Sequence, residues 1–287
     1  MNTNKAKETI TEISISELRP FKGHPYRVVD DEEMDRLVES IEEHGIMTPI
    51  NVRPIEGGYE VISGHRRIHA AKRAGLATIP AIEMDMTRDQ AAVALVDSNL
   101  HREKLLPSEK AFAYKLKLEA LSRQPGRPSK NVSQVGTQKR TDQIMAEEAG
   151  ESRNQIQRYI RLTNLIPPLL RMVDEERIAF TPAVELSYLS QEEQEMLFTE
   201  IGVTLATPSL SQACRLKKLS GEGKLDEDAI AEIMAEEKPN QKERVSVPLS
   251  ALKGKVPDSY TDRQLQEYVI KAVDHYHRYL TRQREVR

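Results

Sequence analysis

The sequence predicts an α+β fold: a small mixed α/β N-terminal domain, then an all-α helix-turn-helix domain and a C-terminal helical dimerisation segment. Two observations predict this order. Strand-like alternation and glycine-marked turns occur before residue 100, whereas helical periods dominate after Pro107. The length of 287 residues also fits about two domains.

Charge and cysteine content exclude several function classes. The chain has 42 Lys and Arg residues, 45 Asp and Glu residues and a formal net charge of −3. Its only cysteine, Cys214, cannot form an internal disulfide or supply a thiolate metal cluster. No apolar stretch reaches the length of about 20 residues that spans a bilayer, and the first residues lack the apolar core of a signal peptide. These features predict a cytoplasmic protein with no membrane partner.

The first domain is expected to begin with a strand and a helix. Residues 12–18 alternate between apolar and polar side chains, which is typical of a strand, before Pro20 breaks the pattern. Asp30 and Glu33 then have the spacing of a capping box. The helix that follows should end at Gly45 and place against a sheet its apolar stripe of Met34, Leu37, Val38 and Ile41.

A hairpin, a second helix, a strand and a third helix are expected next. Residues 49–53 and 59–62 flank the Gly57-Gly58 turn and predict the hairpin. A helical run opens at Ser63 and closes at Gly75. The remaining elements are a strand over 79–82 and a helix from a Thr87–Gln90 capping box to about Leu100.

The second domain is expected to be helical throughout. The stretch 222–238 carries seven acidic residues and fits either an acidic helix or a linker. The expected helices cover 112–121, 142–148, 152–163, 168–174 and 191–200. The expected division is a flexible tail (1–11), an N-terminal mixed α/β domain (12–102), a helix-turn-helix domain (103–221), an acidic linker (222–242) and a dimerisation segment (243–287).

The last helix, from about Thr261, carries a narrow apolar seam. Apolar residues recur there at steps of three and four, a spacing typical of helix pairing. The seam could pair with a second copy, giving a homodimer, or pack on its own chain. Its members are Leu265, Tyr268 or Val269, Ala272, Tyr276 and Tyr279.

Segment 122–140 is basic, with five Lys or Arg residues and no Asp or Glu. Such a stretch beside a folded domain is typical of contact with phosphate backbones, although a solvated loop has the same composition. Lys139 and Arg140, at its end, are the expected DNA contacts.

Residues 142–162 have the spacing of a helix-turn-helix motif. Ala146 is small where two helices cross, Gly150 suits the turn, and Ser152 can cap the second helix. The motif predicts double-stranded DNA as a partner, and a purely structural helix pair is the alternative.

On the second helix of this motif, Ile156 and Ile160 should point inward and polar side chains outward. Arg, Asn and Gln suit base edges and phosphates, and 152–163 contains no acidic residue. The expected DNA contacts are Ser152, Arg153, Asn154, Gln155, Gln157, Arg158 and Arg161.

A glycine and two arginines at a helix start predict an anion site in the first domain. Gly64 allows close backbone approach, and Arg66 and Arg67 lie where helix amides and dipole favour phosphate, although they could simply solvate the helix start. A second polar cluster ends the next helix, and its oxygens suit Mg²⁺ beside phosphates or a plain helix-end surface. That cluster is Asp97, Asn99, His101 and Arg102.

The order of these motifs resembles that of ParB partition proteins. The resemblance covers about residues 12–205 and rests on segments 39–46, 58–67 and 99–102, followed by the helix-turn-helix. Residues 96–121 look closest to ParB-like proteins of mobile elements in Gram-positive bacteria. The resemblance implies a CTP-binding N-terminal domain, a central domain that binds a centromere-like DNA site, a dimer, and nucleoid or plasmid association. A ParA-type ATPase is the partner that the family suggests, and the sequence leaves its existence open.

The resemblance also implies site residues. Gly64, Arg66 and Arg67 match the family's Gly-Glu-Arg-Arg phosphate box. Asn99 and Arg102 match its Glu-Asn-Leu-Gln-Arg box, and the loop 23–27 partly matches its Asn-Pro-x-Gln-Pro-Arg nucleotide loop. The implied nucleotide-site residues are Tyr26, Arg27, Gly64, His65, Arg66, Arg67, Asn99, His101 and Arg102, with Asp97 and Asn99 as magnesium ligands.

Three positions depart from these boxes: His65 and Ser98 stand where the family has Glu, and His101 stands where it has Gln. Loss of the Glu at Ser98 removes a magnesium ligand, so we expect at most a weak CTP hydrolase. The resemblance as a whole implies a dimeric, CTP-responsive DNA clamp acting in plasmid, chromosome or mobile-element partition.

Two other functions remain open at this point. One is a helix-turn-helix transcriptional regulator of a mobile element that uses no nucleotide. The other is a nucleotide-dependent phosphotransferase, since the small α/β fold is similar to sulfiredoxin and to a free-serine kinase. Sulfiredoxin chemistry needs a nucleophilic cysteine, but Ser63 occupies that position.

Overall fold

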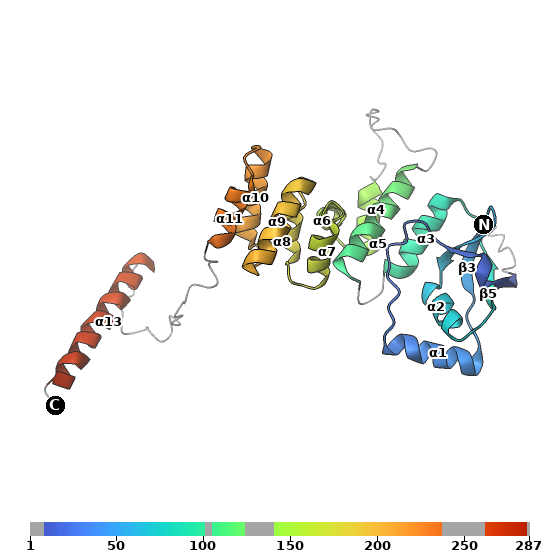
Figure 1. The fold of residues 1–287 in the computed structure, drawn as a ribbon, viewed down its shortest axis with the longest axis horizontal. Helices are drawn as coiled ribbons and strands as arrows, with labels where there is room; N and C mark the ends of the chain where they lie inside the picture. The colour runs from blue at the N-terminus through green and yellow to red at the C-terminus, as the bar shows by residue number, and fades with distance from the viewer. Residues whose placement is uncertain (1–8, 101–104, 124–140, 237–261, 286–287) are drawn as a thin grey trace. The chain divides into compact units, whose positions relative to one another are not determined.

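The structure, a computed structural model, describes residues 9–100, 105–123, 141–236 and 262–285. The chain divides into two compact units, Met1–Glu236 and Glu237–Arg287, each described here by itself. In the first unit a five-stranded sheet is followed along the chain by helices (Figure 1), which confirms the expected α+β class. None of the helices in the described ranges combines the length and apolar character needed to cross a bilayer.

The sheet is built from β1 (Ile10–Ser14), β2 (Leu18–Pro20), β3 (Ile50–Ile55), β4 (Gly58–Ser63) and β5 (Thr78–Glu83). Its strand order is β1-β5-β3-β4-β2. Strands β3 and β4 form the expected antiparallel hairpin, and β5 pairs with β3 in parallel and with β1 in antiparallel orientation. The core against the sheet includes Ile50, Val52, Ile79 and Ala81, which are fully buried.

The single strand expected over 12–18 is wrong. Strands β1 and β2 lie at opposite edges of the sheet, joined by a 3₁₀ turn over Ile15–Glu17. The apolar spacing of two between Ile13 and Ile15 becomes three at Leu18, which breaks strand alternation. The amide of Ile15 donates to the carbonyl of Ala77 at 2.9 Å and fixes the turn.

Helices α1 (Glu32–His44) and α2 (His65–Arg73) form a pair beside the sheet. The buried stripe of α1 packs on α2, around Ala70, and not on a sheet as expected. The cap residue is also corrected: Asp31, not Asp30, accepts from the Met34 amide at 2.9 Å. The carboxylate of Asp30 instead binds Arg73 of α2 at 2.9 Å.

Helix α3 (Arg88–Leu100) begins at the expected capping box. The Thr87 amide donates to Gln90 Oε1 at 2.9 Å, and the Gln90 amide donates to Thr87 Oγ1 at 3.3 Å. Apolar residues of α3, including Leu95 and Val96, pack with Phe21 and with helix α4 (Pro107–Arg123). Helix α4 begins five residues before the expected start at 112, because the Glu109 side chain accepts from the Leu106 amide at 3.1 Å.

The rest of the first unit is helical, as expected. Two of its helices, α8 and α10, are not among the expected ranges. Their core with α7 and α9 is apolar, and Leu169, Leu186, Leu197 and Leu216 are fully buried. The helices are α5 (Thr141–Ala149), α6 (Arg153–Leu162), α7 (Pro167–Asp174), α8 (Phe180–Leu186), α9 (Gln191–Thr204), α10 (Leu210–Gly221) and α11 (Glu227–Ala235).

Of the two alternatives for 222–238, an acidic helix or a linker, the helix is confirmed over the residues of α11, so the linker expected to begin at 222 is wrong there. Ile230, Ile233 and Met234 are buried in the core with α9 and α10, while the acidic residues of this helix are exposed. The side-chain amide of Gln212 also donates to the Ile233 carbonyl at 2.7 Å. The acidic composition therefore marks the solvent face of a packed helix.

The second unit contains α13 (Asp262–Glu285), which begins where the sequence indicates. Leu265 and Val269 of the expected seam are half-buried, and Tyr268 and Tyr276 are exposed. The side chain of Tyr279 lies outside the described residues.

Candidate functional site

Three segments of the first unit meet around a cavity of about 230 Å³. They are the loop after β2, the start of α2 and the end of α3. The structure thus brings together most of the expected nucleotide-site residues, while His101 and Arg102 lie outside the described residues. The lining residues are His24, Tyr26, Arg27, Val28, Ser63, Gly64, His65, Arg66, Arg67, Ser98 and Asn99.

Gly64 shapes the start of α2 at this pocket. Its φ of 101° is in the left-handed region, and a Cβ there would lie 2.5 Å from Cγ2 of Ile50. Only glycine fits both the conformation and the space. The first amides of α2 have no acceptor within the helix and, together with the helix dipole, favour an anion.

Arg67 is held rigidly at the pocket wall. Its Nη1 donates to the carbonyls of Thr48 and Pro49, both at 2.6 Å. Burial of the guanidinium lowers the pKa of Arg67 from its usual value. An arginine of this type stays charged at neutral pH, so it supplies a fixed positive charge.

Arg66 also lines the pocket, but two carboxylates of α1 hold it. Its Nη1 donates to Glu33 Oε2 at 3.2 Å, and its Nη2 lies 3.5 Å from Asp31 Oδ1. The side chain remains 33% exposed. The two neighbouring arginines therefore differ: Arg67 bonds to uncharged carbonyls, and Arg66 bonds to acids.

A pair of histidine rings forms another wall. The centroids of His24 and His65 are 3.8 Å apart, with the rings tilted by 45°. Tyr26 lies edge-on to His24 at 5.5 Å and is itself buried. His24 was not among the expected site residues; its position beside the Gly23 turn of the nucleotide loop is the signal that could have found it.

Arg27 lies at the pocket, yet its side chain reaches away to the helical region. Its guanidinium bonds to Asp174 of α7 at 3.3 Å, and its backbone amide donates to Glu109 of α4 at 2.8 Å. The contribution of Arg27 in this structure is therefore to fix the loop.

Asp97 is not at the pocket, so its expected role as a magnesium ligand is wrong. Its carboxylate accepts from Nζ of Lys117 at 2.5 Å, and Lys117 also binds Glu148 of α5 at 2.6 Å. Burial lowers the pKa of Lys117, but the bonds to these two carboxylates outweigh it and leave that pKa raised. Asp97 turns away from the pocket because this buried ammonium needs it.

The pocket does not fit a magnesium ion held by the protein alone. None of its described lining residues is Asp or Glu, and the described part of the chain contains no cluster of three or more His, Cys, Asp or Glu suited to a metal. The amide nitrogen of Asn99 donates to the Leu95 carbonyl at 2.8 Å. The side-chain oxygens of Ser98 and Asn99 are weak metal ligands compared with the carboxylates that Mg²⁺ prefers.

Helices α5 and α6 have the expected helix-turn-helix geometry. Gly150 has a φ of 65° at the turn, and Ser152 Oγ accepts from the Gln155 amide at 3.2 Å. Ile156 is fully buried with Ala146, as predicted, and Ile160 is half-buried against the same cluster.

The exposed face of α6 is narrower than the sequence predicts. Ser152, Arg153, Asn154 and Gln157 are exposed and Gln155 is half-buried; Arg153 also binds Asp142 at 2.6 Å. These residues form the candidate nucleic-acid face. Lys139 and Arg140 lie outside the described residues.

Arg158 and Arg161 are half-buried, so their expected exposure is wrong. Arg158 donates to Thr181 at 2.9 Å and lies 5.0 Å from the Phe180 ring centroid. Arg161 donates to the Ser187 carbonyl at 3.3 Å. Both arginines pack on α8 or its end, and the sequence did not reveal that helix.

The first unit therefore places the chain in a class of DNA-binding-type proteins in which an α/β domain with an arginine-lined pocket precedes a helix-turn-helix domain. Residues 1–100 match the family described as the ParB N-terminal domain. A nucleoid occlusion protein of Bacillus cytotoxicus is 31% identical over 240 residues, which cover 83% of this chain and 72% of that protein. The chain belongs to the ParB family.

Other relatives support the same family assignment. Stage 0 sporulation protein J of Bacillus subtilis is 34% identical over 170 residues, or 59% of this chain. The chain spans 54% of that protein and 64% of a nucleoid occlusion protein of Halalkalibacterium halodurans. That its nearest relatives belong to mobile elements of Gram-positive bacteria stays a prediction.

Solved structures of this family are also similar to the chain. Caulobacter crescentus ParB complexed with CTP-gamma-S is 25% identical, covering 62% of this chain and 92% of that chain at a TM-score of 0.31. The same protein complexed to the centromeric parS site is 22% identical, covering 72% and 98% at a TM-score of 0.42. The family assignment rests on the sequence relatives.

Proposed function

We propose that this chain is a sequence-specific DNA-binding partition protein that acts as a CTP-responsive dimeric clamp. The observation that carries the proposal is the pocket in which Tyr26, the box beginning at Gly64, and Asn99 meet. The same compact unit carries the helix-turn-helix. Nucleotide and DNA would thus act on one folded unit.

The chemistry of the pocket supports a phosphate-bearing ligand. The start of α2 presents helix amides, and Arg66 and Arg67 add two positive charges. CTP is the nucleotide that membership of the family suggests. Because the described lining contains no carboxylate, we propose binding as the role of the nucleotide, with weak hydrolysis at most and no magnesium held by the protein alone.

The exposed face of α6 supports DNA binding. Arg153, Asn154 and Gln157 are side chains that can read base edges in a major groove. We propose a centromere-like site or an operator as the target, with Lys139 and Arg140 as phosphate contacts. The names of the relatives, in nucleoid occlusion and chromosome partitioning, support a cytoplasmic, nucleoid-associated or plasmid-associated protein.

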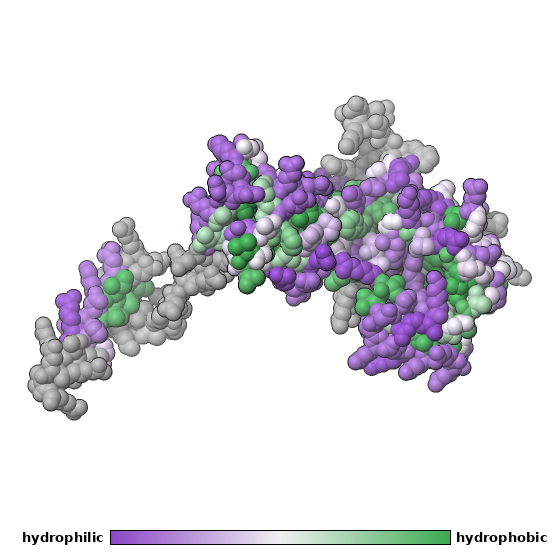
Figure 2. Space-filling view, viewed as in Figure 1, coloured by the Kyte–Doolittle hydropathy of each residue, from purple (hydrophilic) through white to green (hydrophobic). Residues whose placement is uncertain are grey.

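The apolar surface of α13 supports dimerisation. Figure 2 shows a hydrophobic patch on this helix. Ile270, Val273 and Tyr276 are each more than 60% exposed. Exposed apolar side chains on one helix favour pairing with a second copy. A ParA-type ATPase is a further proposed partner, supported by family membership alone.

The test is a calorimetric titration of CTP, with ATP and GTP as controls, into wild-type protein and Arg66→Ala. Selective CTP binding that the substitution abolishes is the expected result. Failure of every nucleotide to bind, with DNA binding intact, would select the nucleotide-independent regulator of a mobile element, which the departures at His65 and Ser98 favour.

A phosphotransferase of the sulfiredoxin type has less support. Ser63 lines the pocket where that chemistry needs a thiolate, and Cys214 lies on α10, outside the pocket lining. A hydroxyl at this position lacks the required nucleophilicity at neutral pH.

A further inference from the structure

The positive charge of Arg66 at the pocket is balanced by two acids that lie beside it at the start of α1. Its guanidinium donates to Glu33 and forms an ion pair with Asp31. Their side chains are 48% exposed for Asp31 and 73% exposed for Glu33. Solvent-exposed ion pairs are weak, so a multiply charged ligand can displace them.

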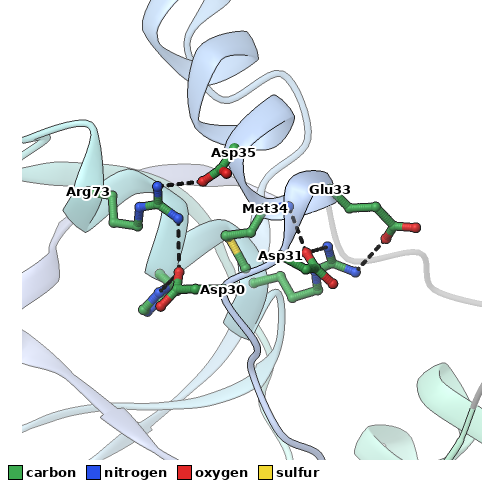
Figure 3. A network of polar contacts seen from close by, with 8 residues as sticks. Asp30, Asp31, Glu33, Met34, Asp35 and Arg73 are labelled. Carbon is green, nitrogen blue, oxygen red and sulfur yellow. Dashed lines mark hydrogen bonds and ion pairs between the residues drawn. The ribbon is translucent and has the colours of Figure 1, made fainter.

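A separate set of contacts keeps α1 attached to α2. Arg73 binds Asp30 at 2.9 Å and Asp35 at 2.6 Å (Figure 3), and His69 binds Asp30 at 2.9 Å. These residues are not among the described lining residues of the pocket. The Arg66 contacts can therefore exchange while the helix pair stays together.

Phosphate oxygens and the carboxylates of Asp31 and Glu33 can both accept hydrogen bonds from the guanidinium of Arg66. A guanidinium binds either anion through the same N–H groups, preferably two at a time. A phosphate group that binds Arg66 competes with Glu33 for the N–H groups of the guanidinium, and any carboxylate that stays nearby repels the ligand. The acids therefore act against binding of an anion.

We infer that Asp31 and Glu33 are positioning residues that hold Arg66 as internal counter-anions and so lower the affinity of the pocket for polyphosphates. The inference rests on the proposed nucleotide function. It assigns the start of α1 a role in setting ligand affinity, beyond capping a helix. Ligand binding should in turn release both carboxylates from Arg66.

The test compares Glu33→Gln, Asp31→Asn and the double variant with wild type in calorimetric titrations of CTP at 0.15 M salt. Asn keeps a side-chain oxygen for the Met34 amide, so α1 retains its cap. Each single substitution should tighten CTP binding about threefold and the pair about tenfold, as expected for loss of exposed ion pairs. Glu32→Gln removes the same charge from a neighbour that pairs with Arg36, and it should leave affinity unchanged.

A second readout separates this role from a structural one. Without ligand, Glu33→Gln should leave the melting temperature equal or slightly lower, so affinity rises while intrinsic stability does not. Unchanged or weaker CTP binding by the variants, when wild type binds through Arg66, overturns the inference alone. If none of the proteins binds CTP, both the proposed nucleotide function and the inference are overturned. If the variants bind CTP and wild type does not, the inference is supported.

Discussion

The guanidinium of Arg27 bonds to the carboxylate of Asp174 at 3.3 Å although the two residues are 147 positions apart in the chain. Asp174 also accepts from the backbone amide of Ser108 at 3.0 Å and from its hydroxyl at 2.7 Å. The pocket loop, the start of α4 and the end of α7 are thus joined at one carboxylate.

Asp174→Ala should lower the free energy of unfolding by about 1–3 kcal/mol, because it leaves the donors of Ser108 without an acceptor. The Asp174 side chain is only 6% exposed, so water compensates little. Urea titration followed by circular dichroism measures the effect. Glu175→Ala, at a side chain that is 57% exposed, is the control, and equal midpoints for the two variants would contradict the prediction.

Gly64→Ala should destabilise the protein more than Gly75→Ala. Both residues have positive φ, but a Cβ at Gly75 meets nothing within 4 Å, whereas one at Gly64 meets Ile50. We expect about 1 kcal/mol for Gly75→Ala from backbone strain and about 1–3 kcal/mol beyond that for Gly64→Ala from the clash. Thermal unfolding of both variants gives the comparison, and equal losses would show that β3 yields to the added methyl group.

Stability should fall in alkali through Tyr114. Burial raises the pKa of its phenol well above the ordinary value of 10.0, and the neighbouring Glu151 adds to this shift. Because the folded-state pKa is the higher one, this contribution is complete below about pH 10 and is lost as the pH rises further. Tyr114→Phe should therefore reduce the fall in melting temperature between about pH 9 and about pH 11.

The control for this titration is Tyr188→Phe, at a side chain that is 46% exposed. It should reproduce the wild-type fall in melting temperature. Identical curves for Tyr114→Phe and wild type would assign the alkaline loss to other groups.

Arg153 and Arg161 should have separable roles on α6. Arg153→Ala should relax sequence preference, costing about 1–3 kcal/mol of discrimination on a DNA site selected from a random pool. Arg161→Ala should instead lower stability by about 0.5–2 kcal/mol, because the guanidinium lies 3.8 Å from the Tyr188 ring centroid. Fluorescence anisotropy on selected and scrambled DNA measures discrimination, and urea titration measures stability. If Arg161→Ala lost discrimination and Arg153→Ala lost only stability, the DNA-binding surface would lie near α8 instead.

Features encoded by neighbouring residues were predictable from the sequence. The hairpin at Gly57-Gly58, the Thr87 capping box and the Ser152 cap all depend on contacts within a few positions. The burial of Ile156 was predictable from the apolar spacing along its helix. The association of the loop around Tyr26 with Gly64 and Asn99 was also expected, although only from resemblance to a family.

Long-range contacts were not predictable in this way. Asp97 was expected at a metal site because nothing nearby indicates its partner Lys117, which lies 20 positions away. Arg158 was expected to be exposed because α8 has only seven residues and a weak helical pattern. Asp30 does not cap α1 because its carboxylate binds His69 and Arg73 of α2, and its neighbour Asp31 accepts from the Met34 amide instead.

Lys117 is 2% exposed, and its ammonium is shared by Asp97 of α3 and Glu148 of α5. Since Asp97 directly precedes the pocket residues Ser98 and Asn99, α3 cannot tilt away from α4 alone. Such a tilt must either move α5 together with α3 or leave the buried Lys117 ammonium without its carboxylate partner. The Lys117 ammonium therefore connects α3, α4 and α5. As a result, the first helix of the helix-turn-helix is held rigidly to the pocket residues at the end of α3.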